Sequence, residues 1–161
     1  MKDIIDKYYK QHGKIVYYYL YKVTGNGDLA EELTQETFYQ AMRTVDKYKG
    51  ECTPSVWLCQ IARHLWYQYL EKNTKIKKVS FEVIENEISD EGNNEFWNRQ
   101  DKIELYKKIQ TLDKEVKETI YLRLSGDLSF AEIGQIMGKS ENWARVTFFR
   151  GKQQLMKGER I

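Results

Sequence analysis

The side chains best suited to covalent or metal chemistry are Cys52, Cys59 and His64, which lie close together in the sequence. A zinc site takes four ligands, or three and a water molecule, and no second Cys/His cluster is present to complete one. Two cysteines do not build a disulfide framework, so we expect two small thiols that are buried or half-buried. The pattern predicts no metal and no cofactor.

Catalytic patterns are also missing from the sequence. It has no Gly-rich phosphate loop, and neither His12 nor His64 has an acidic partner in a recognisable Ser/His/acid arrangement. The sequence therefore predicts that the protein is not an enzyme and has no catalytic residues.

Clustered charge is the stronger chemical signal. The chain of 161 residues has 26 Lys and Arg against 24 Asp and Glu, a net charge of only +2. That total is a cancellation: residues 43–78 carry +5 and residues 139–160 carry +4, whereas residues 26–42 carry −4 and residues 79–98 carry −6. Each block alone fits an ordinary solvated face, but the asymmetry indicates several distinct binding surfaces.

Membrane insertion and export are not expected from the sequence. No uncharged apolar run approaches the roughly 18 residues that span a bilayer, and the N-terminus lacks an apolar signal core. Hydrophobic residues make up 41% and charged residues 31%, as in folded proteins. We expect a cytoplasmic protein.

Helices must position the charged blocks, because a single proline among the 161 residues argues against an all-β chain. Apolar side chains at helical spacing predict a first helix over residues 3–24. Asp28, with Glu31 as a capping-box partner, is expected to cap a second helix reaching Val45. Thr53 is expected to cap a third, with Pro54 at its first position, running to about Lys72.

The pattern weakens between these helices and the C-terminal part of the chain. We predict an all-α protein with a helical domain over residues 1–72, a flexible acidic linker over 73–100 that contains at most one short helix, and a smaller helical domain over 101–161. In the second domain, apolar stripes predict one helix with Ile103, Tyr106 and Ile109, and another with Val116, Ile120, Leu122 and Leu124 that stops at Gly126.

A helix-turn-helix is the most informative local prediction. Ser129 and Glu132 form a capping box, and Leu128 with Ile133 supplies the hydrophobic staple. The short helix 130–137 is expected to end at Gly138, and Ser140 to cap a longer helix that reaches about residue 157. Gly134 falls where the two helices would approach each other closely.

Two separate blocks of sequence resemble the bacterial extracytoplasmic-function sigma factors. The first block runs from Asp28-Leu29-Ala30-Glu31-Glu32-Leu33 to Phe38 and continues through Tyr48-Lys49-Gly50 and Trp57-Leu58-Cys59-Gln60-Ile61-Ala62-Arg63. The second is Leu128-Ser129-Phe130-Ala131-Glu132-Ile133-Gly134 with residues 145–150. The sequence departs from the family pattern at His64, Gln68, Gly134, Trp143, Ala144 and Gly151, changes that concern the promoter sequence and not the role.

The resemblance implies a sigma factor that binds core RNA polymerase, at the β′ clamp helices and the β flap, recognises −35 and −10 promoter elements, and helps to melt the −10 region. It implies a second domain of the winged-helix-like, sigma region 4 type, and an anti-sigma factor as a partner. The implied polymerase-binding residues are Asp28, Glu31, Glu32, Gln35 and Glu36. Those implied for the −10 element are Lys47, Tyr48, Lys49, Arg63, His64 and Tyr67, and those for the −35 element are Ser140, Arg145, Val146, Phe149, Arg150 and Lys152.

Several alternatives remain open on the sequence alone. The C-terminal half by itself allows a helix-turn-helix regulator that binds operators without being a polymerase subunit, and an inactivated interaction module is a further alternative. Leu33, Phe38 and Trp57 are interpreted as core side chains at least as readily as contact residues. Arg63, His64 and Tyr67 are expected on the exposed face of their helix, and Trp66 at the edge of the core.

Overall fold

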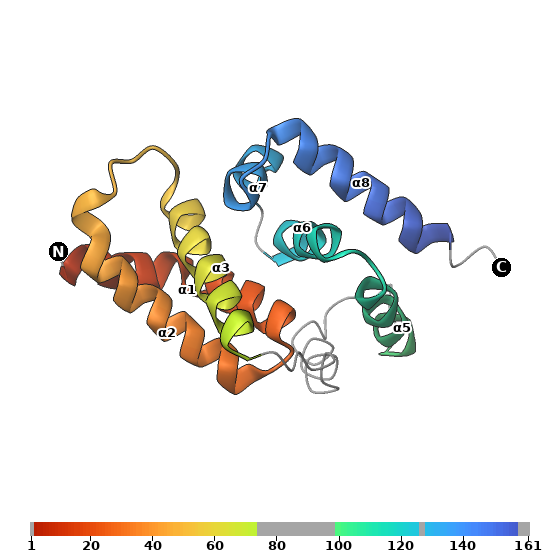
Figure 1. Cartoon of the computed structure of the whole chain (residues 1–161), viewed down its shortest axis with the longest axis horizontal. Coiled ribbons are helices and arrows are strands. Elements are labelled where there is room, and N and C mark those ends of the chain that lie inside the picture. Colours follow the sequence, from red (N-terminus) through yellow and green to blue (C-terminus); the bar gives the residue numbers. More distant parts are fainter. Residues whose placement is uncertain (1, 74–98, 126–127, 158–161) are drawn as a thin grey trace.

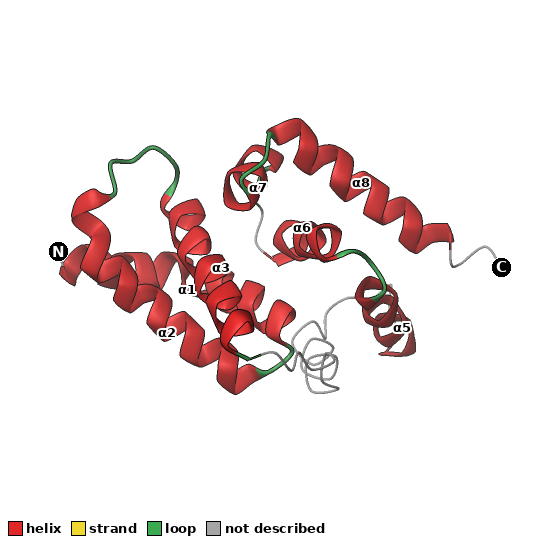
Figure 2. Ribbon diagram, in the orientation of Figure 1, coloured by secondary structure: helices red, strands yellow, loops and turns green. Residues whose placement is uncertain are grey.

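The structure, a computed structural model, describes residues 2–73, 99–125 and 128–157, and in these ranges it contains helices and no strand (Figures 1 and 2). The all-α prediction is confirmed there. No helix of the described part is long and apolar enough to cross a membrane. In chain order the elements are α1 (Lys2–Thr24), α2 (Gly27–Thr44), the 3-10 turn η1 (Val45–Lys47), α3 (Pro54–Lys72), α5 (Arg99–Gln110), α6 (Lys114–Ser125), α7 (Phe130–Met137) and α8 (Glu141–Lys157).

The first three helices pack against one another, each burying one apolar stripe. Tyr19 of α1, Ala30 of α2 and Leu58 of α3 are completely buried at the centre of this bundle. Leu33 and Phe38 also belong to the core. Trp66, expected at the edge, is only 8% exposed and stacks on Tyr69 at 5.8 Å between ring centroids.

The start of α2 differs from the prediction. Asn26 is the N-cap, and its side chain accepts a hydrogen bond of 3.1 Å from the Leu29 amide. Asp28 instead lies in the first turn, where the positive end of the helix dipole stabilises its negative charge. Gly25 explains the earlier start, because its φ of +68° turns the chain early enough for Asn26 to cap. The cap of α3 is as predicted, with Thr53 at the N-cap and Pro54 following it.

The helix-turn-helix prediction is confirmed in its local details. Ser129 and Glu132 form a reciprocal capping box, Gly138 ends α7 with a φ of +70°, and Ser140 accepts a hydrogen bond of 3.0 Å from the Trp143 amide. A Cβ at Gly134 would lie 2.7 Å from the Ser140 carbonyl oxygen, so the close approach of the two helices requires glycine.

A second close approach joins α8 to α6. A Cβ at Gly151 would lie 2.7 Å from Val116 and 2.8 Å from Ile120. This contact gives a physical reason for the family departure at position 151. Leu124, which the apolar stripe placed with the core, is 57% exposed, since its neighbours Tyr121 and Leu122 face inward.

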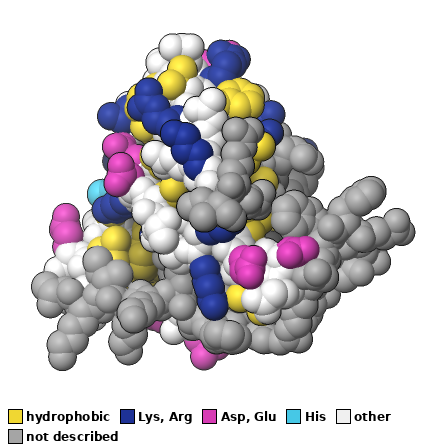
Figure 3. Space-filling view, turned by 90° about the vertical axis from the view of Figure 1, so that its right-hand side faces the viewer, with side chains coloured by type: hydrophobic (Ala, Val, Ile, Leu, Met, Phe, Trp, Pro, Cys, Tyr) yellow, Lys and Arg dark blue, Asp and Glu magenta, His cyan; other side chains and the backbone are white. Residues whose placement is uncertain are grey.

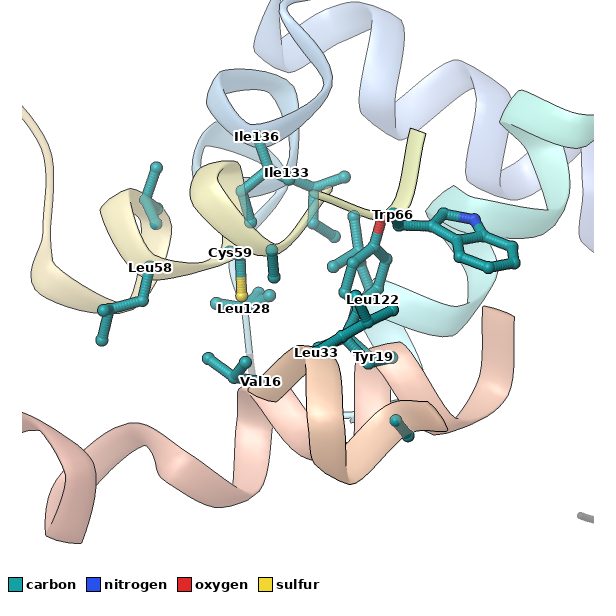
Figure 4. Close-up of a cluster of buried hydrophobic side chains, with 14 of the residues drawn as sticks. Val16, Tyr19, Leu33, Leu58, Cys59, Trp66, Leu122, Leu128, Ile133 and Ile136 are labelled. Atoms are coloured by element: carbon teal, nitrogen blue, oxygen red, sulfur yellow. The ribbon is translucent and has the colours of Figure 1, made fainter. Parts of the chain in front are cut away.

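The hydrophobic core does not stop where the second helical segment begins. Side chains of α6, α7 and α8 join the cluster formed by α1, α2 and α3, and Figure 4 shows side chains of α1, α2, α3 and α7 in it. Helix α3 contacts α7, and α1 contacts α6. A smaller cluster lies between α5, α6 and α8, and Val23 of α1 packs against it. The predicted acidic linker falls almost entirely within residues 74–98, outside the described residues.

Candidate nucleic-acid and polymerase interfaces

Helix α8 turns one face to the core and leaves the other open. Ala144, Thr147 and Gly151 are buried at helical spacing. The opposite face carries all of the −35 residues implied within this helix, and each of them is exposed. They are Arg145, Val146, Phe149, Arg150 and Lys152. Ser140, which caps the helix, is exposed beside them.

Arg145 is held loosely on this open face. Its guanidinium forms a 2.8 Å ion pair with Glu141 one turn earlier, and both side chains are about half exposed, at 45% and 53%. Such a surface pair contributes at most about 1 kcal/mol, so a DNA phosphate or base can displace the carboxylate. The guanidinium also lies 5.4 Å from the ring centroid of Phe130.

An aromatic group at the contact of α7 and α8 positions Phe149. Its ring lies 6.0 Å from Phe130 and packs edge-on against Phe148 at 5.4 Å. Although 47% exposed, the ring is therefore fixed in direction, which suits contact with a thymine methyl group. Figure 3 shows Lys and Arg side chains beside hydrophobic ones in the upper half of one end of the molecule, at the height of α8.

The expectation that Arg63, His64 and Tyr67 of α3 all face solvent is wrong for two of them. His64 is exposed, with its ring 3.0 Å from the Gln68 amide. Arg63 and Tyr67 are half-buried, because both contact Glu118 of α6. The Arg63 Nε donates a 2.8 Å hydrogen bond to the Glu118 carboxylate, and the Tyr67 hydroxyl donates to its other oxygen. The sequence placed these side chains on the polar side of the helix correctly but did not reveal what covers that side.

Electrostatics strengthen this contact. Burial opposes the charge on Arg63, but the hydrogen bond and negative charge of Glu118 outweigh it and raise the pKa of the guanidinium. Burial, together with Glu118, raises the pKa of Tyr67, so its hydroxyl remains a donor. Burial likewise raises the pKa of Tyr19, whose hydroxyl donates to Glu118 from α1 at 3.3 Å.

In the loop between α2 and α3, the side chain of Tyr48 already has partners within the protein. Tyr48 stacks on Trp57 with ring centroids 4.4 Å apart and planes only 9° from parallel, and its hydroxyl donates to the Cys52 carbonyl. Trp57 is thus neither a bare platform nor fully core, but the partner that orders Tyr48. Lys47 and Lys49, on either side of Tyr48, are exposed.

The implied polymerase face on α2 is open as expected. Asp28, Glu31, Glu32 and Gln35 are exposed, while Glu36 is half-buried and accepts a 3.0 Å hydrogen bond from Gln40. Because the other side of this helix is in the core, the carboxylates project from a rigid support.

Beside this face lies a pocket that sequence patterns did not indicate. It lies between α1 and α2, and Tyr9, Lys14, Tyr18, Glu31 and Gln35 are among the residues that line it. A run of tyrosines at positions 17–19 was the available signal, but only the packing of α1 on α2 shows which of them face outward.

The cysteines match their prediction. Cys52 is half-buried, Cys59 is buried, and both are free thiols. Burial, with the nearby charge of Glu132, raises the pKa of Cys59 to about 12, which keeps it protonated and unreactive. Within the described residues no group of three His, Cys, Asp or Glu side chains is placed to hold a metal ion.

The segment that forms the first three helices is similar to a known protein family. The family model for Sigma-70 region 2 matches residues 8–76. The chain is 26% identical over 161 residues to the RNA polymerase sigma factor YlaC of Bacillus subtilis, covering 97% of this chain and 92% of that protein. It is 28% identical over 151 residues to the ECF RNA polymerase sigma factor SigM of the same organism, covering 94% and 92%.

Other relatives are longer than this chain. The ECF RNA polymerase sigma factor BldN of Streptomyces coelicolor is 27% identical over 95% of this chain but only 59% of its own length. Among solved structures, the sigma factor RpoE of Bartonella quintana, crystallised with the anti-sigma factor NepR, aligns with a TM-score of 0.72. At 17% identity over 98% of this chain and 96% of that one, the match shows that the two folds are alike.

Proposed function

We propose that the chain is an extracytoplasmic-function sigma factor of bacterial RNA polymerase and that its residues divide the work of transcription initiation between two parts. Residues 1–72 bind core polymerase and recognise the −10 element. Residues 101–161 recognise the −35 element through the helix-turn-helix, and residues 73–100 connect the two parts.

At the −35 element, α8 enters the major groove with its open face. Arg145 and Arg150 are placed to bind base edges, and Val146 and Phe149 to contact thymine methyl groups. Ser140 and Lys152 contact phosphates near the two ends of the footprint, Ser140 together with the helix N-terminus. The support is that these side chains share one exposed face while the opposite face is buried.

At the −10 element, the loop before α3 and the polar side of α3 stabilise unpaired bases. Lys47, Lys49 and Arg63 supply positive charge for the DNA backbone, and Tyr48 and Tyr67 supply rings on which bases stack. His64 lies on the same side of the helix as Arg63 and Tyr67. The Tyr48–Trp57 stack holds the loop so that a base leaving the duplex meets a fixed ring.

Core polymerase is bound through the acidic face of α2, opposite a basic helical pair such as the β′ clamp helices, while the second half reaches the β flap. Complementary charge on the two partners speeds their encounter and fixes their orientation. The protein acts in the cytoplasm and catalyses no reaction itself. An anti-sigma factor is a further proposed partner, supported by the Bartonella relative, which was crystallised with one.

One observation carries this proposal: the exposed carboxylates of α2 lie on a rigid helix inside the segment that matches Sigma-70 region 2. Charge reversal by Glu32→Lys with Glu36→Lys tests it. We expect at least a tenfold loss of affinity for core polymerase, with folding retained.

The matched control is Glu104→Lys, an exposed carboxylate on α5, which changes charge without touching α2. Affinity measured by fluorescence anisotropy with purified core enzyme decides the outcome. Equal core affinity in all variants contradicts the assignment of α2. A wild-type chain that never binds core, yet retards promoter DNA alone, identifies an operator-binding regulator instead.

A further inference from the structure

The carboxylate of Glu118 joins helices from the two halves of the molecule. Glu118 of α6 is 2% exposed, and it receives hydrogen bonds from Arg63 and Tyr67 of α3 and from Tyr19 of α1. All three donors come from the N-terminal helices, more than fifty residues earlier in the sequence, whereas Glu118 belongs to the C-terminal half.

Cations surround the same cluster. The Tyr67 ring has the Arg63 guanidinium 4.6 Å from its centroid and the Lys114 ammonium of α6 at 3.9 Å. Arg63 and Tyr67 also hydrogen bond to each other at 3.2 Å. The two groups that a nucleic acid would use, the guanidinium and the aromatic ring, are therefore already occupied.

Polar contacts continue along α3 toward its N-terminus. The Gln60 side-chain amide donates a 3.0 Å hydrogen bond to the Gln135 carbonyl of α7, and the Thr53 hydroxyl donates a 3.1 Å bond to Glu132. Beneath them Cys59 is buried in the shared core. Side chains of α7 and α6 therefore contact α3 at several points between its N-cap and Tyr67.

From this geometry we propose that Glu118 is a latch: it occupies, within the protein, the place that a DNA phosphate takes on Arg63 and Tyr67, and keeps the α3 surface closed until the two halves separate. The inference rests on the proposed function of α3 in −10 binding. A carboxylate and a phosphate both accept charge-assisted hydrogen bonds from a guanidinium, so the two compete for one donor.

Competition at this site makes closure and DNA binding by α3 mutually exclusive. A buried ion pair also loses much of its Coulomb attraction to the desolvation of its charges, so it fixes a geometry more than it adds stability. Such a contact suits a latch, because replacing Glu118 by another anionic acceptor on the same donors costs little net energy.

Glu118→Gln tests the latch, since glutamine keeps the size and loses the charge. The probe is a fluorescein-labelled single-stranded oligonucleotide of about 20 nucleotides and mixed sequence, with the free protein at low salt, where phosphate contacts are strongest. We expect Glu118→Gln to bind it at least fivefold more tightly than the wild type. Glu115→Gln, an exposed position on the same helix, removes the same charge and is expected to leave the affinity unchanged.

Separation of the halves is measured directly by pulsed electron paramagnetic resonance. Spin labels at Gln11→Cys in α1 and Gln153→Cys in α8, both exposed positions, are attached in a Cys52→Ser background. We expect one narrow distance distribution in the wild type and a longer, broader one in Glu118→Gln. Unchanged distances together with unchanged oligonucleotide affinity overturn the proposal.

A cross-linked variant provides a test that is independent of the stability of Glu118→Gln. Gln60→Cys and Gln135→Cys, joined by a bismaleimide with a reducible spacer, hold α3 against α7. We expect at least a tenfold loss of run-off transcription that recovers when the spacer is reduced. Full transcription from the cross-linked chain overturns the latch, whereas a wild-type chain that never binds core polymerase overturns the proposed function and leaves the distance result standing.

Discussion

Arg63 of α3 and Arg145 of α8 each form an ion pair of 2.8 Å with a glutamate and each lie over an aromatic ring. Their surroundings differ. The pair of Arg63 is 22% and 3% exposed and joins α3 to α6, whereas that of Arg145 is 45% and 53% exposed and stays within one helical turn. Similar residue types therefore give one covered surface and one open surface, because tertiary packing and not composition sets how available an arginine is.

The largest expected contrast is in the reactivity of the two thiols beside these surfaces. Burial holds the pKa of Cys59 at about 12, under the cover of α7, while Cys52 lies half-exposed in the loop before α3. Burial also raises the pKa of the Cys52 thiol, but Cys52 is only half-buried. Since the thiolate is the reactive form, we expect Cys59 to react with iodoacetamide at pH 8 at least about 100-fold more slowly than Cys52. Mass spectrometry of the alkylated peptides gives both rates, and comparable rates would show that α3 is not covered.

The same thiol gives a pH dependence. Its pKa in the folded protein, about 12, lies above its ordinary value of about 9.0, so the neutral form is the one that folding favours. This contribution to stability is complete below about pH 9 and is lost as the pH rises toward 12. In urea unfolding across that range, we expect Cys59→Ala to show a shallower decline than the wild type.

Next in size is the effect of Gly134→Ala, which damages the open surface without touching α3. A Cβ would lie 2.7 Å from a backbone oxygen, and backbone yields less readily than a side chain. We expect a loss of about 3 kcal/mol in the free energy of unfolding, measured in urea. The neighbouring exposed residue provides the control, Gln135→Ala, with almost no loss; an unaffected Gly134→Ala would mean that α7 and α8 are further apart.

The two arginines themselves provide the third test. Removing one partner of a largely buried pair strands the other charge, so Arg63→Ala is expected to lower the free energy of unfolding by about 2 kcal/mol. Arg145→Ala is expected to cost less than about 1 kcal/mol. Equal losses of unfolding free energy for the two variants, measured by thermal and urea unfolding, would show that the two arginines are equally accessible.

The smallest effect is on promoter binding. With the polymerase holoenzyme on a promoter found by run-off transcription from genomic DNA, Arg145→Ala and Arg150→Ala are each expected to weaken binding about tenfold, the effect of losing one base contact. Core affinity is expected to stay at the wild-type value. A loss of core affinity in either variant would assign α8 to the polymerase and not to DNA.

Local features of the fold were predictable because their causes are local. The capping box of Ser129 and Glu132, the turn at Gly138 and the Thr53–Pro54 start of α3 each depend on residues within a few positions of one another. The predicted cap of α2 was wrong by two residues: Asn26, directly after a glycine at positive φ, is the N-cap in place of Asp28.

The candidate site was predictable in its residue types and helix faces but not in its accessibility. The family resemblance implied a set of −35 residues on α8, and the structure leaves these side chains exposed. Helical periodicity put Arg63 and Tyr67 on the polar face of α3, but both are half-buried there because they contact Glu118 of α6. The sequence around Glu118 does not indicate that its partners lie more than fifty residues earlier. The sequence around Tyr48 does not indicate that its ring stacks on Trp57.

By itself the sequence determined the helices, the helix-turn-helix, the division of charge into blocks and, through two motifs, a resemblance to the extracytoplasmic-function sigma factors. Helical periodicity and capping encode these features within a few residues of chain. Only the tertiary structure decided that the two halves share a core and that a buried carboxylate of α6 holds the arginine of α3. Pairing between distant segments depends on shape and burial summed over many side chains, which no short stretch of sequence records.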